Sequence, residues 1–404
     1  MRIAVIGGGA AGFFSAIAAA ESGISEVMVF EASSKCLEKV RVSGGGRCNV
    51  THACFDTAEL CSHYPRGGKE LRQAFSRFMT GDTVNWFEEH GVELKTERDG
   101  RMFPVTDDSS TIVNCLLKTA ESLGVNVRLR SKVSGLKKKS DGFVLVLLDG
   151  KELEFDKVIV TTGGHPKKES YEWLALLGHS VISPVPSLFT FNIPYEPLRE
   201  LMGVSVDHAR VDIVGMDEHA DGPLLITHWG LSGPAVLRCS SFAARKLADA
   251  GYVFQVSVDW LPDESVDETV AWMESQRKEK RAARFRNTPH PDVPRRLWEF
   301  LLREASIAVD SNWSDLKKEA IRTFSLMVHD HRFRAEGKTT FKEEFVTCGG
   351  ISLREIDFKT MESRVIRGLY FAGEVLDIDA VTGGFNFQAA WTTGFIAGHS
   401  ASEN

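Results

Sequence analysis

The residues best suited to chemistry stand near the start of the chain, where Gly7–Gly12 reads GGGAAG and has the spacing G-x-G-x-x-G. The first glycine permits a tight turn, the second leaves room for a phosphate beside the backbone, and the third lets a helix pack against a strand. The N–H groups at the start of such a helix attract negative charge. Glu31 follows about 20 residues later, where a carboxylate accepts hydrogen bonds from a ribose and disfavours a 2′-phosphate. We therefore predict a dinucleotide site at Gly7–Gly12 and Glu31.

A second glycine-rich segment, Ser43–Asn49, reads SGGGRCN and has Lys39 upstream. Three consecutive glycines expose backbone N–H groups and leave space for a flat or charged ligand. A flexible surface loop is the alternative, but the segment follows the nucleotide unit directly, which favours a loop that contacts the cofactor. Arg47, inside this segment, is one of two candidate catalytic residues.

Glycines also follow two later hydrophobic runs. Val158–Gly164 reads VIVTTGG, so small residues end a strand and let the backbone approach a ligand at the carboxyl edge of a sheet. Gly368–Glu374 reads GLYFAGE, and Thr382–Gln388 reads TGGFNFQ and opens the last helix. If the positive end of that helix points at the N1/C2=O edge of a flavin, it stabilises the reduced ring. An ordinary capped helix is the alternative.

The second candidate catalytic residue is His228, which lies with Trp229 between two glycine-containing turns. A packed, hydrogen-bonded pair without a role in a reaction is the alternative. The remaining histidines, among them His52, His63 and His90, share no metal-ligand spacing, so no metal is predicted.

The seven cysteines are odd in number and irregular in spacing, which favours neither a disulfide framework nor a zinc site. Cys48 lies in the glycine-rich loop, where a redox-active disulfide would make the protein a thiol reductase. Those flavoenzymes carry C-x-x-x-x-C, whereas five residues separate Cys48 from Cys54. We therefore interpret the cysteines as reduced thiols of a cytosolic protein.

Alternating β and α patterns must position the residues of the first motif. The chain has 404 residues, enough for two or three domains. Residues 3–6 are typical of a buried strand, 10–21 of a helix and 27–30 of a second strand, which together form the β-α-β unit of a doubly wound sheet. We predict a loop at 35–49. The runs 143–148 and 153–160 flank Asp149-Gly150, which is a strong hairpin signal.

The pattern changes near residue 187. Apolar and polar residues alternate through 189–193, 204–213 and 252–260, as in half-buried antiparallel strands. Apolar residues then take helical spacing, and the chain ends with strand 368–372 and helix 386–401. We predict an α/β protein whose Rossmann-type nucleotide-binding domain is discontinuous, at 1–187 and 338–404. The insert comprises a barrel-like, β-rich substrate domain at 188–262 and 325–337 and a helical subdomain at 263–324.

The composition is that of a globular protein, with 43% hydrophobic and 25% charged residues. The formal net charge of −7 implies no general attraction to nucleic acid or to an anionic membrane, and neither is expected as a partner. Arg277–Arg286 contains six basic residues and one acidic residue and could contact RNA, but a solvated helix face is the usual explanation. The N-terminus lacks the pattern of a signal peptide, and the apolar run 10–20 is too short to span a bilayer. These observations predict a cytoplasmic location.

Several of these motifs together resemble a known family. They are the first glycine motif, Ser43–Asn49, THWGLSGP at Thr227–Pro234, GGISLREI at Gly349–Ile356, and Gly368–Gln388. This combination is similar to the bacterial flavoproteins of the aminoacetone oxidase-like or BaiN-like family, within the glutathione-reductase-type superfamily with two dinucleotide domains. The resemblance spans nearly the whole chain. It departs after Gly164, where HPKKESY replaces a glycine- and serine-rich turn, which implies a different substrate-side loop.

The resemblance implies FAD, with its pyrophosphate at the first glycine motif, its ribose at Glu31 and its adenine beside the backbone near Val133. It also implies that Lys39–Asn49 and Gly373–Asn386 surround the flavin, and that the chain carries an inserted β-barrel and a helical subdomain. The predicted cofactor-binding residues are Gly7, Gly9, Ala10, Ala11, Gly12, Glu31, Ala32, Lys39, Ser43, Gly44, Gly45, Arg47, Cys48, Asn49, Val133, Thr162, Gly163, Gly373, Glu374, Gly383, Gly384, Phe385 and Asn386.

We predict hydride transfer through flavin N5, with a small organic substrate or a reduced nicotinamide as one partner. A second pyridine-nucleotide fingerprint is absent from the sequence, so the choice between NADH and NADPH stays open, as do the substrate, the electron acceptor and the oligomeric state. Two alternatives are a flavoprotein that modifies transfer RNA and a flavin-holding redox sensor without turnover. RNA binding would identify the first, and bound FAD without steady-state oxidation of any donor would identify the second.

Overall fold

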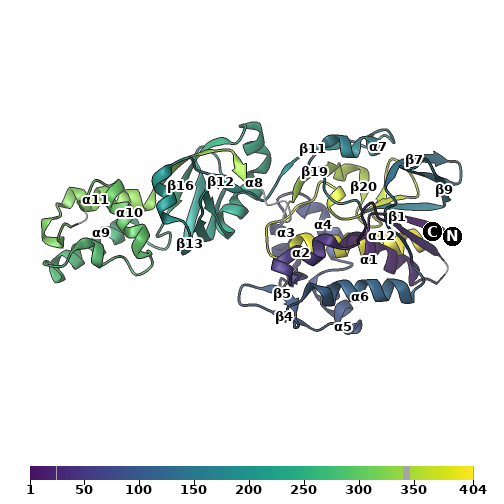
Figure 1. Ribbon diagram of the computed structural model, residues 1–404, viewed down its shortest axis with the longest axis horizontal. Coiled ribbons are helices and arrows are strands. Elements are labelled where there is room, and N and C mark those ends of the chain that lie inside the picture. The colour runs from purple at the N-terminus through teal and green to yellow at the C-terminus, as the bar shows by residue number, and fades with distance from the viewer. Residues whose placement is uncertain (24, 309, 340–345, 404) are drawn as a thin grey trace. The chain divides into compact units, whose positions relative to one another are not determined.

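The computed structural model describes residues 1–23, 25–308, 310–339 and 346–403 (Figure 1). The chain divides into two compact units, each with its own hydrophobic core. The first unit comprises Met1–Ser187 and Lys342–Asn404, and the second comprises Leu188–Phe341. Both ends of the chain therefore belong to the first unit, and the second unit is inserted between them.

A central sheet of seven strands organises the first unit. Its strands are β1 (Arg2–Ile6), β2 (Glu26–Phe30), β6 (Asn126–Arg128), β10 (Lys157–Val160), β20 (Ile356–Asp357), β21 (Glu362–Ser363) and β22 (Leu369–Phe371), in the order β20-β21-β22-β10-β1-β2-β6. The pairs from β22 through β6 are parallel. Apart from their first residues, β1, β2 and β10 are buried, as expected for strands covered on both faces. Because parallel strands end at one edge, Gly7, Glu31 and Thr161 come together there.

The first and last helices pack closely against each other. They are α1 (Ala10–Ala20) and α12 (Phe385–Glu403). A Cβ at Gly394 would lie 2.7 Å from Ala11 O, and one at Gly398 would lie 2.3 Å from Ser15 O, so only glycine lets the two backbones approach this far. Gly394 lies next to Ala11 and Gly398 lies next to Ser15, so the two helices run in the same direction. With a rise of about 1.5 Å per residue, α12 begins about 13 Å before the level of Ala11.

Smaller elements surround the central sheet. One three-stranded sheet contains β7 (Val133–Lys139), β8 (Gly142–Leu147) and β9 (Glu152–Phe155), another contains β3 (Thr51–His52), β4 (Leu94–Thr96) and β5 (Arg101–Pro104), and β11 (Val181–Pro186) pairs with β19 (Thr347–Ile351). The helices are α2 (Glu38–Gly46), α3 (Thr57–Ser62), α4 (Gly68–Phe75), α5 (Thr80–Glu89), α6 (Ser109–Ser122) and α7 (Glu172–Ala175). The hairpin predicted at Asp149-Gly150 is confirmed by the antiparallel pair β8–β9.

Two predictions about these elements were wrong. The predicted loop 35–49 contains α2, because the helix-favouring run Glu38–Val42 precedes the break in helical geometry at Ser43–Gly45. The run 153–160 is two strands rather than one. It divides at Asp156, whose carboxylate accepts a hydrogen bond from Arg2 N at 2.6 Å, so β9 completes the hairpin and β10 joins the parallel sheet.

The second unit contains a seven-stranded sheet that returns on itself. Its strands are β12 (Thr190–Asn192), β13 (Ser205–Ile213), β14 (His219–Ile226), β15 (Gly230–Ser232), β16 (Val253–Asp259), β17 (His331–Glu336) and β18 (Lys338–Thr339), in the order β17-β16-β13-β14-β15-β12-β18. Only Gly337 separates β17 from β18, so the two edges of the sheet are one run of chain and the sheet closes like a barrel. Helix α8 (Pro234–Asp249) packs against β13 and β14.

The helical part of the second unit contains α9 (Val266–Glu279), α10 (Arg295–Glu304) and α11 (Lys318–His329). Buried aromatic rings pack them together, with Phe285 and Phe324 both in contact with Trp298. The predicted α/β class, with a Rossmann-type domain interrupted by β-rich and helical parts, is confirmed. Within the described residues, no helix combines the length and the apolar character needed to cross a membrane.

Candidate cofactor and active site

The N-terminus of α1 leaves an open position for an anion. The first hydrogen bond inside the helix runs from Phe13 N to Gly9 O at 3.0 Å, and no side chain caps Gly9. The N–H groups of Ala10, Ala11 and Gly12 precede that bond, as at every helix start. A Cβ built on Gly9 would meet no atom within 4 Å. Space and positive potential therefore coincide where the sequence predicts a diphosphate.

The other two glycines of the motif are required by the protein itself. Gly7 has φ +114°, and a Cβ there would lie 2.4 Å from Thr161 O. A Cβ on Gly12 would lie 1.9 Å from Gly7 O. Thr161 also donates its hydroxyl to Ile6 O at 3.0 Å and to Gly7 O at 2.9 Å, which fixes the turn to β10. Gly7 and Gly12 are therefore needed by the packing of the protein itself, whereas Gly9 faces open space.

Glu31 ends β2 with its carboxylate held in place. One oxygen accepts a hydrogen bond from Gly8 N at 2.8 Å and the other accepts from Ser33 N at 2.7 Å. Ser131 N donates to Glu31 O at 2.8 Å, so the chain that leads into Val133 lies beside this residue, as does the exposed Ala32. A ribose hydroxyl approaching from the diphosphate side would find a fixed acceptor here.

The glycine-rich segment Ser43–Asn49, which overlaps the end of α2, has one open side. Gly44 and Gly45 have φ of +58° and +69°, values that favour glycine. A Cβ on Gly45 would meet nothing within 4 Å, whereas one on Gly44 would lie 2.9 Å from the Phe103 ring. Cys48 N donates to Ser43 O at 3.0 Å, and burial raises the pKa of the Cys48 thiol to about 12. The segment is a shaped turn, and its cysteine is a buried, protonated thiol.

Asn49 joins this segment to the far end of the chain. Its side-chain oxygen is buried and has no hydrogen-bond partner among the described residues. A Cβ on Gly384 would lie 2.9 Å from that oxygen and 2.5 Å from Thr51 O, so Gly384 approaches as closely as a backbone can. Gly383 O lies 3.1 Å from His52 Nδ1. An unused acceptor beside the start of α12 fits a hydrogen-bond donor from a bound group.

The start of α12 is fixed by its own side chains. Asn386 accepts a hydrogen bond from Ala380 N at 3.0 Å and donates to Ala380 O at 3.1 Å. Phe385 O accepts from the hydroxyl of Tyr64 at 2.6 Å, and the Phe385 ring stacks on the His63 ring with centroids 4.1 Å apart. Asn386 therefore shapes the loop before the helix, where the sequence predicted a contact with the cofactor.

An ion pair between Lys39 and Glu374 lies at the carboxyl edge of the parallel sheet. Lys39 Nζ lies 2.7 Å from a carboxylate oxygen of Glu374, whose other oxygen accepts from Thr347 N at 3.2 Å. Gly373 has φ +75°, and a Cβ there would lie 2.8 Å from Ala11 Cβ. The chain at Gly373 therefore lies against α1, and Glu374, the next residue, lies beside that helix. A residue that the sequence did not single out for chemistry, His165, joins this group. Burial, and then the charge of Lys39, lower the pKa of its imidazole.

Thr162 and Gly163 precede His165 at the carboxyl end of β10. Gly163 has φ +73°, and a Cβ there would meet nothing within 4 Å. The signal that could have found His165 was its position directly after the VIVTTGG run, at the edge where the other site segments end.

Arg47 does not present a free guanidinium. It lies 2.6 Å from Glu97 and 3.4 Å from Asp107, and its guanidinium carbon stands 4.0 Å from the centre of the Phe103 ring. The hydrogen bond to Glu97, with the charge of both carboxylates, raises the pKa of Arg47. No local pattern predicts these partners, because they lie 50 and 60 residues further along the chain.

His228 belongs to the second unit, so it is not among the residues that the first unit brings together. Its ring and that of Trp229 have centroids 3.4 Å apart, and both side chains are exposed. A tight turn carries them, in which Thr227 N donates to Gly230 O at 2.8 Å. The pair is therefore held on a rigid turn and faces solvent rather than being packed inside the barrel.

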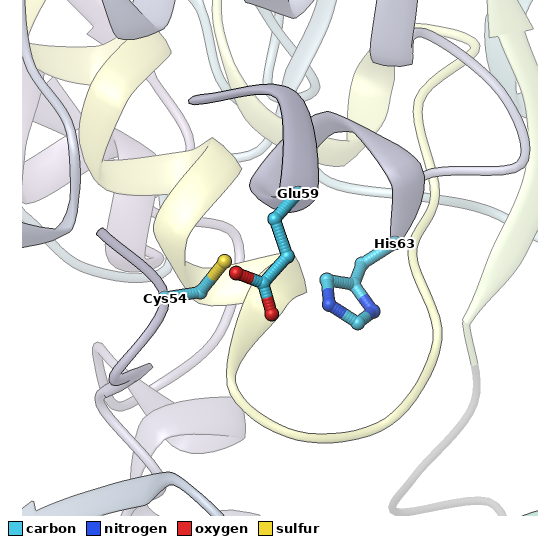
Figure 2. Close-up of side chains that lie close together, drawn as sticks. All are labelled: Cys54, Glu59 and His63. Atoms are coloured by element: carbon cyan, nitrogen blue, oxygen red, sulfur yellow. The ribbon is translucent and has the colours of Figure 1, made fainter. Parts of the chain in front are cut away.

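A cysteine, a carboxylate and an imidazole meet beside α12 (Figure 2). The ligand atoms of Cys54, Glu59 and His63 all lie within 4.8 Å of one another. Glu59 and His63 come from positions i and i+4 around α3, a spacing that the sequence analysis did not weigh. Burial, with the charge of Glu59, raises the pKa of the Cys54 thiol to about 11, so the thiol stays protonated at neutral pH. The three side chains thus bring a thiol, a carboxylate and an imidazole close together.

These features together fit an elongated dinucleotide. The open position at Gly9 suits the diphosphate, the fixed carboxylate of Glu31 suits a ribose, and the unused oxygen of Asn49 suits a hydrogen-bond donor of the ring system. The offset of about 12 Å between the two helix starts leaves room for a molecule with a diphosphate at one point and a ring system further along. FAD has this arrangement of parts.

Comparison with known proteins places the chain in a family. It matches the family described as HI0933-like protein Rossmann domain over residues 1–400. It is 29% identical over 411 residues to the 3-dehydro-bile acid delta(4,6)-reductase of Clostridium scindens, covering 100% of this chain and 99% of that protein. It is 30% identical over 397 residues to the ribosomal RNA dihydrouridine synthase of Escherichia coli, covering 96% of this chain and 95% of that protein.

Solved structures show the same fold. The 3-ketosteroid-delta4-(5alpha)-dehydrogenase from Rhodococcus jostii matches with a TM-score of 0.51 at 15% identity, covering 100% of this chain and 96% of that one. A flavocytochrome c3 fumarate reductase matches with a TM-score of 0.51 at 15% identity, covering 100% and 78%. The predicted resemblance, the FAD cofactor and the oxidoreductase class are confirmed. The chain belongs to the HI0933-like Rossmann family and is an FAD-dependent oxidoreductase.

Proposed function

We propose that the protein reduces a carbon–carbon double bond conjugated to a carbonyl group. The observation that carries this proposal is that two full-length relatives with different names share this chemistry. A delta(4,6)-reductase of a 3-dehydro bile acid and a dihydrouridine synthase each saturate such a bond. Reduction of an α,β-double bond of this kind adds a hydride to the β-carbon and a proton to the α-carbon, and a reductant such as NADH or NADPH supplies the two electrons.

Bound FAD supplies the hydride in this chemistry. The role of the protein is to hold the cofactor at the starts of two helices, with the diphosphate at α1 and the ring near α12. Positive potential at α12 favours the negative charge of the reduced ring. The ion pair of Lys39 with Glu374 ties the glycine-rich segment to the sheet edge, which keeps the two ring-side segments together.

The histidines and Arg47 have different proposed roles. His228 stays a candidate catalytic residue, because its imidazole is exposed on a tight turn of the inserted unit. His165, whose lowered pKa keeps it neutral at neutral pH, suits a hydrogen bond to the substrate carbonyl. Arg47 acts as a positioning residue, because Glu97 and Asp107 hold its guanidinium and with it the glycine-rich turn.

Anaerobic stopped-flow spectroscopy tests the proposal. The FAD-loaded protein is reduced with NADH or NADPH while flavin absorbance is followed, and is then mixed with a 4-en-3-one steroid, with a uridine-containing RNA or with an isolated alkene. We expect reoxidation by at least one conjugated acceptor and none by the isolated alkene. Reduction of the flavin by amines, followed by reoxidation only by oxygen, would instead make the protein an oxidase and overturn the proposal. Stable flavin with no turnover in any mixture would favour the redox-sensor alternative.

Uridine in ribosomal RNA is a second candidate for the conjugated acceptor. It is favoured by 30% identity to the ribosomal RNA dihydrouridine synthases of Escherichia coli and Haemophilus influenzae, covering 96% and 98% of this chain. A small enone would need only a pocket beside the ring, whereas an RNA substrate also needs a surface that binds phosphates. The two candidates therefore differ in what the rest of the molecule must provide.

A further inference from the structure

We propose that the basic segment Arg277–Arg286 of the inserted unit is a binding surface for RNA phosphates. The inference rests on the proposed reduction of a conjugated double bond and names its substrate class as a uridine within RNA. The segment comprises the end of α9 and the chain that follows it, in the helical part labelled α9, α10 and α11 in Figure 1. Its cations are Arg277, Lys278, Lys280, Arg281, Arg284 and Arg286.

Most of these charges lack a neutralising carboxylate. Arg284 and Arg286 share a single carboxylate, that of Asp310, at 2.9 and 3.3 Å. Glu279, the acidic residue of the segment, accepts a hydrogen bond from Ser275 at 2.9 Å. The other four cations form no ion pair with any residue that the structure describes: Arg277, Lys278, Lys280 and Arg281. The segment is therefore a local excess of positive charge in a chain whose net charge is −7.

The segment is fixed in place. Phe285 is fully buried within it and packs on Trp298 and Trp313, with ring centroids 5.1 and 4.2 Å away. The backbone of the segment accepts two hydrogen bonds from the short helix Trp313–Asp315: Trp313 N donates to Ala283 O at 3.0 Å, and Ser314 N donates to Arg281 O at 3.1 Å. A ligand that binds here orders only side chains, so it loses less conformational entropy than a flexible basic tail would.

Helix electrostatics explains only part of the pattern. Arg277 and Lys278 lie in the last turn of α9, where cations are favoured by the carbonyl end of the helix. Lys280 and Arg281 follow the helix, and their proximity to the first two cations raises the electrostatic energy of the surface unless anions approach it. A polyanion with regularly spaced charges removes this repulsion at several residues together.

The neighbouring surface favours RNA over a membrane. A helix that lies on an anionic bilayer needs exposed apolar side chains to enter the interface. Within the described residues, none of the exposed large hydrophobic side chains falls between 266 and 303. Likeness to the two ribosomal RNA dihydrouridine synthases supplies the second, independent reason for RNA as the polyanion.

Fluorescence anisotropy with the full-length, FAD-loaded protein tests the proposal. The probe is a short fluorescein-labelled RNA hairpin with a uridine loop, titrated at several KCl concentrations. The test variant changes all four unpaired cations of the segment to glutamine: Arg277→Gln, Lys278→Gln, Lys280→Gln and Arg281→Gln. The matched control removes the same charge at four exposed lysines scattered over the first unit: Lys69→Gln, Lys118→Gln, Lys151→Gln and Lys359→Gln.

We expect the test variant to bind the hairpin about tenfold or more weakly, with a slope of log Kd on log [KCl] lower by about 3, because each lost phosphate contact removes about 0.7 from that slope. The control should bind like the wild type. Equal weakening in both variants, no binding by the wild type at low salt, or tighter binding to phosphatidylserine vesicles than to RNA overturns the proposal. Reoxidation by a small enone in the same variants is a separate readout, so failure of the reductase chemistry is told apart from failure of the RNA surface.

Discussion

Replacing Gly9 by alanine should weaken FAD binding and leave the fold intact, whereas Gly12→Ala should weaken the fold. The two positions lie three residues apart in one motif, but only Gly9 faces open space. Its φ of −89° and ψ of −167° are accessible to alanine, so the backbone need not move. A Cβ on Gly12 would instead lie 1.9 Å from Gly7 O, inside the turn itself.

The magnitudes follow from these contacts. At Gly9, two effects on the unfolding free energy oppose each other. Alanine is a poorer helix N-cap than glycine, but it also makes the unfolded chain less flexible, and the two effects cancel to within about 1 kcal/mol. The new methyl group occupies the space of a phosphate oxygen, and losing one charge-assisted hydrogen bond costs about 1.5–3 kcal/mol of binding. The Kd for FAD should therefore rise by about 10- to 150-fold. Gly12→Ala should lower the unfolding free energy by about 1–3 kcal/mol or more.

Two assays separate the effects. Quenching of flavin fluorescence on titration of deflavinated protein gives the Kd, and urea unfolding of the apoprotein gives the stability. Wild-type affinity in Gly9→Ala would show that no phosphate lies over Gly9. Equal loss of stability in the two variants would show that Gly9 does not face open space, and either result would refute the reasoning.

Three further predictions concern the rest of the molecule. Asp379→Asn should destabilise the first unit by about 3–5 kcal/mol in urea unfolding, because it leaves the guanidinium of Arg66 without its buried carboxylate; an unchanged midpoint would contradict this. Burial lowers the pKa of His331 to about 4, so the unfolded chain, with a pKa near 6.5, binds the proton more readily. Stability should be fully present above about pH 6.5 and should fall by about 3 kcal/mol as the pH drops to 4, and His331→Gln should remove this part of the slope. Iodoacetamide at pH 8, followed by mass spectrometry, should leave Cys48 unmodified because it is fully buried, whereas the partly exposed Cys61 should react; equal labelling would show that the glycine-rich segment opens.

The sequence predicted the site wherever a residue type had a local reason to be there. Gly7 and Gly12 are needed by contacts within one β-α-β unit, so their spacing identified the motif. The barrel strands were likewise predicted, because alternate residues of such a strand are buried. The last helix was predicted from the glycine pair that precedes it. The helix α2 was missed because the glycines that end it dominated the pattern of the whole segment.

The parts of the site that the sequence did not predict depend on contacts between distant segments. Arg47 is held by Glu97 and Asp107, which are joined to it only by the fold. The approach of Gly384 to Asn49 links the two ends of the chain, and no local spacing encodes it. The loop is open at Gly45 but not at Gly44, because Phe103, a residue of another strand, packs against Gly44.

The central claim is that both ends of the chain hold one FAD, with the diphosphate at the start of α1 and the ring near the start of α12. A crystal structure of the protein with FAD measures this directly. We predict diphosphate oxygens within about 3 Å of the backbone N–H groups of Ala10–Gly12 and the ring beside Gly383–Asn386. A ring bound away from α12, or a diphosphate that leaves those N–H groups unused, would contradict the account.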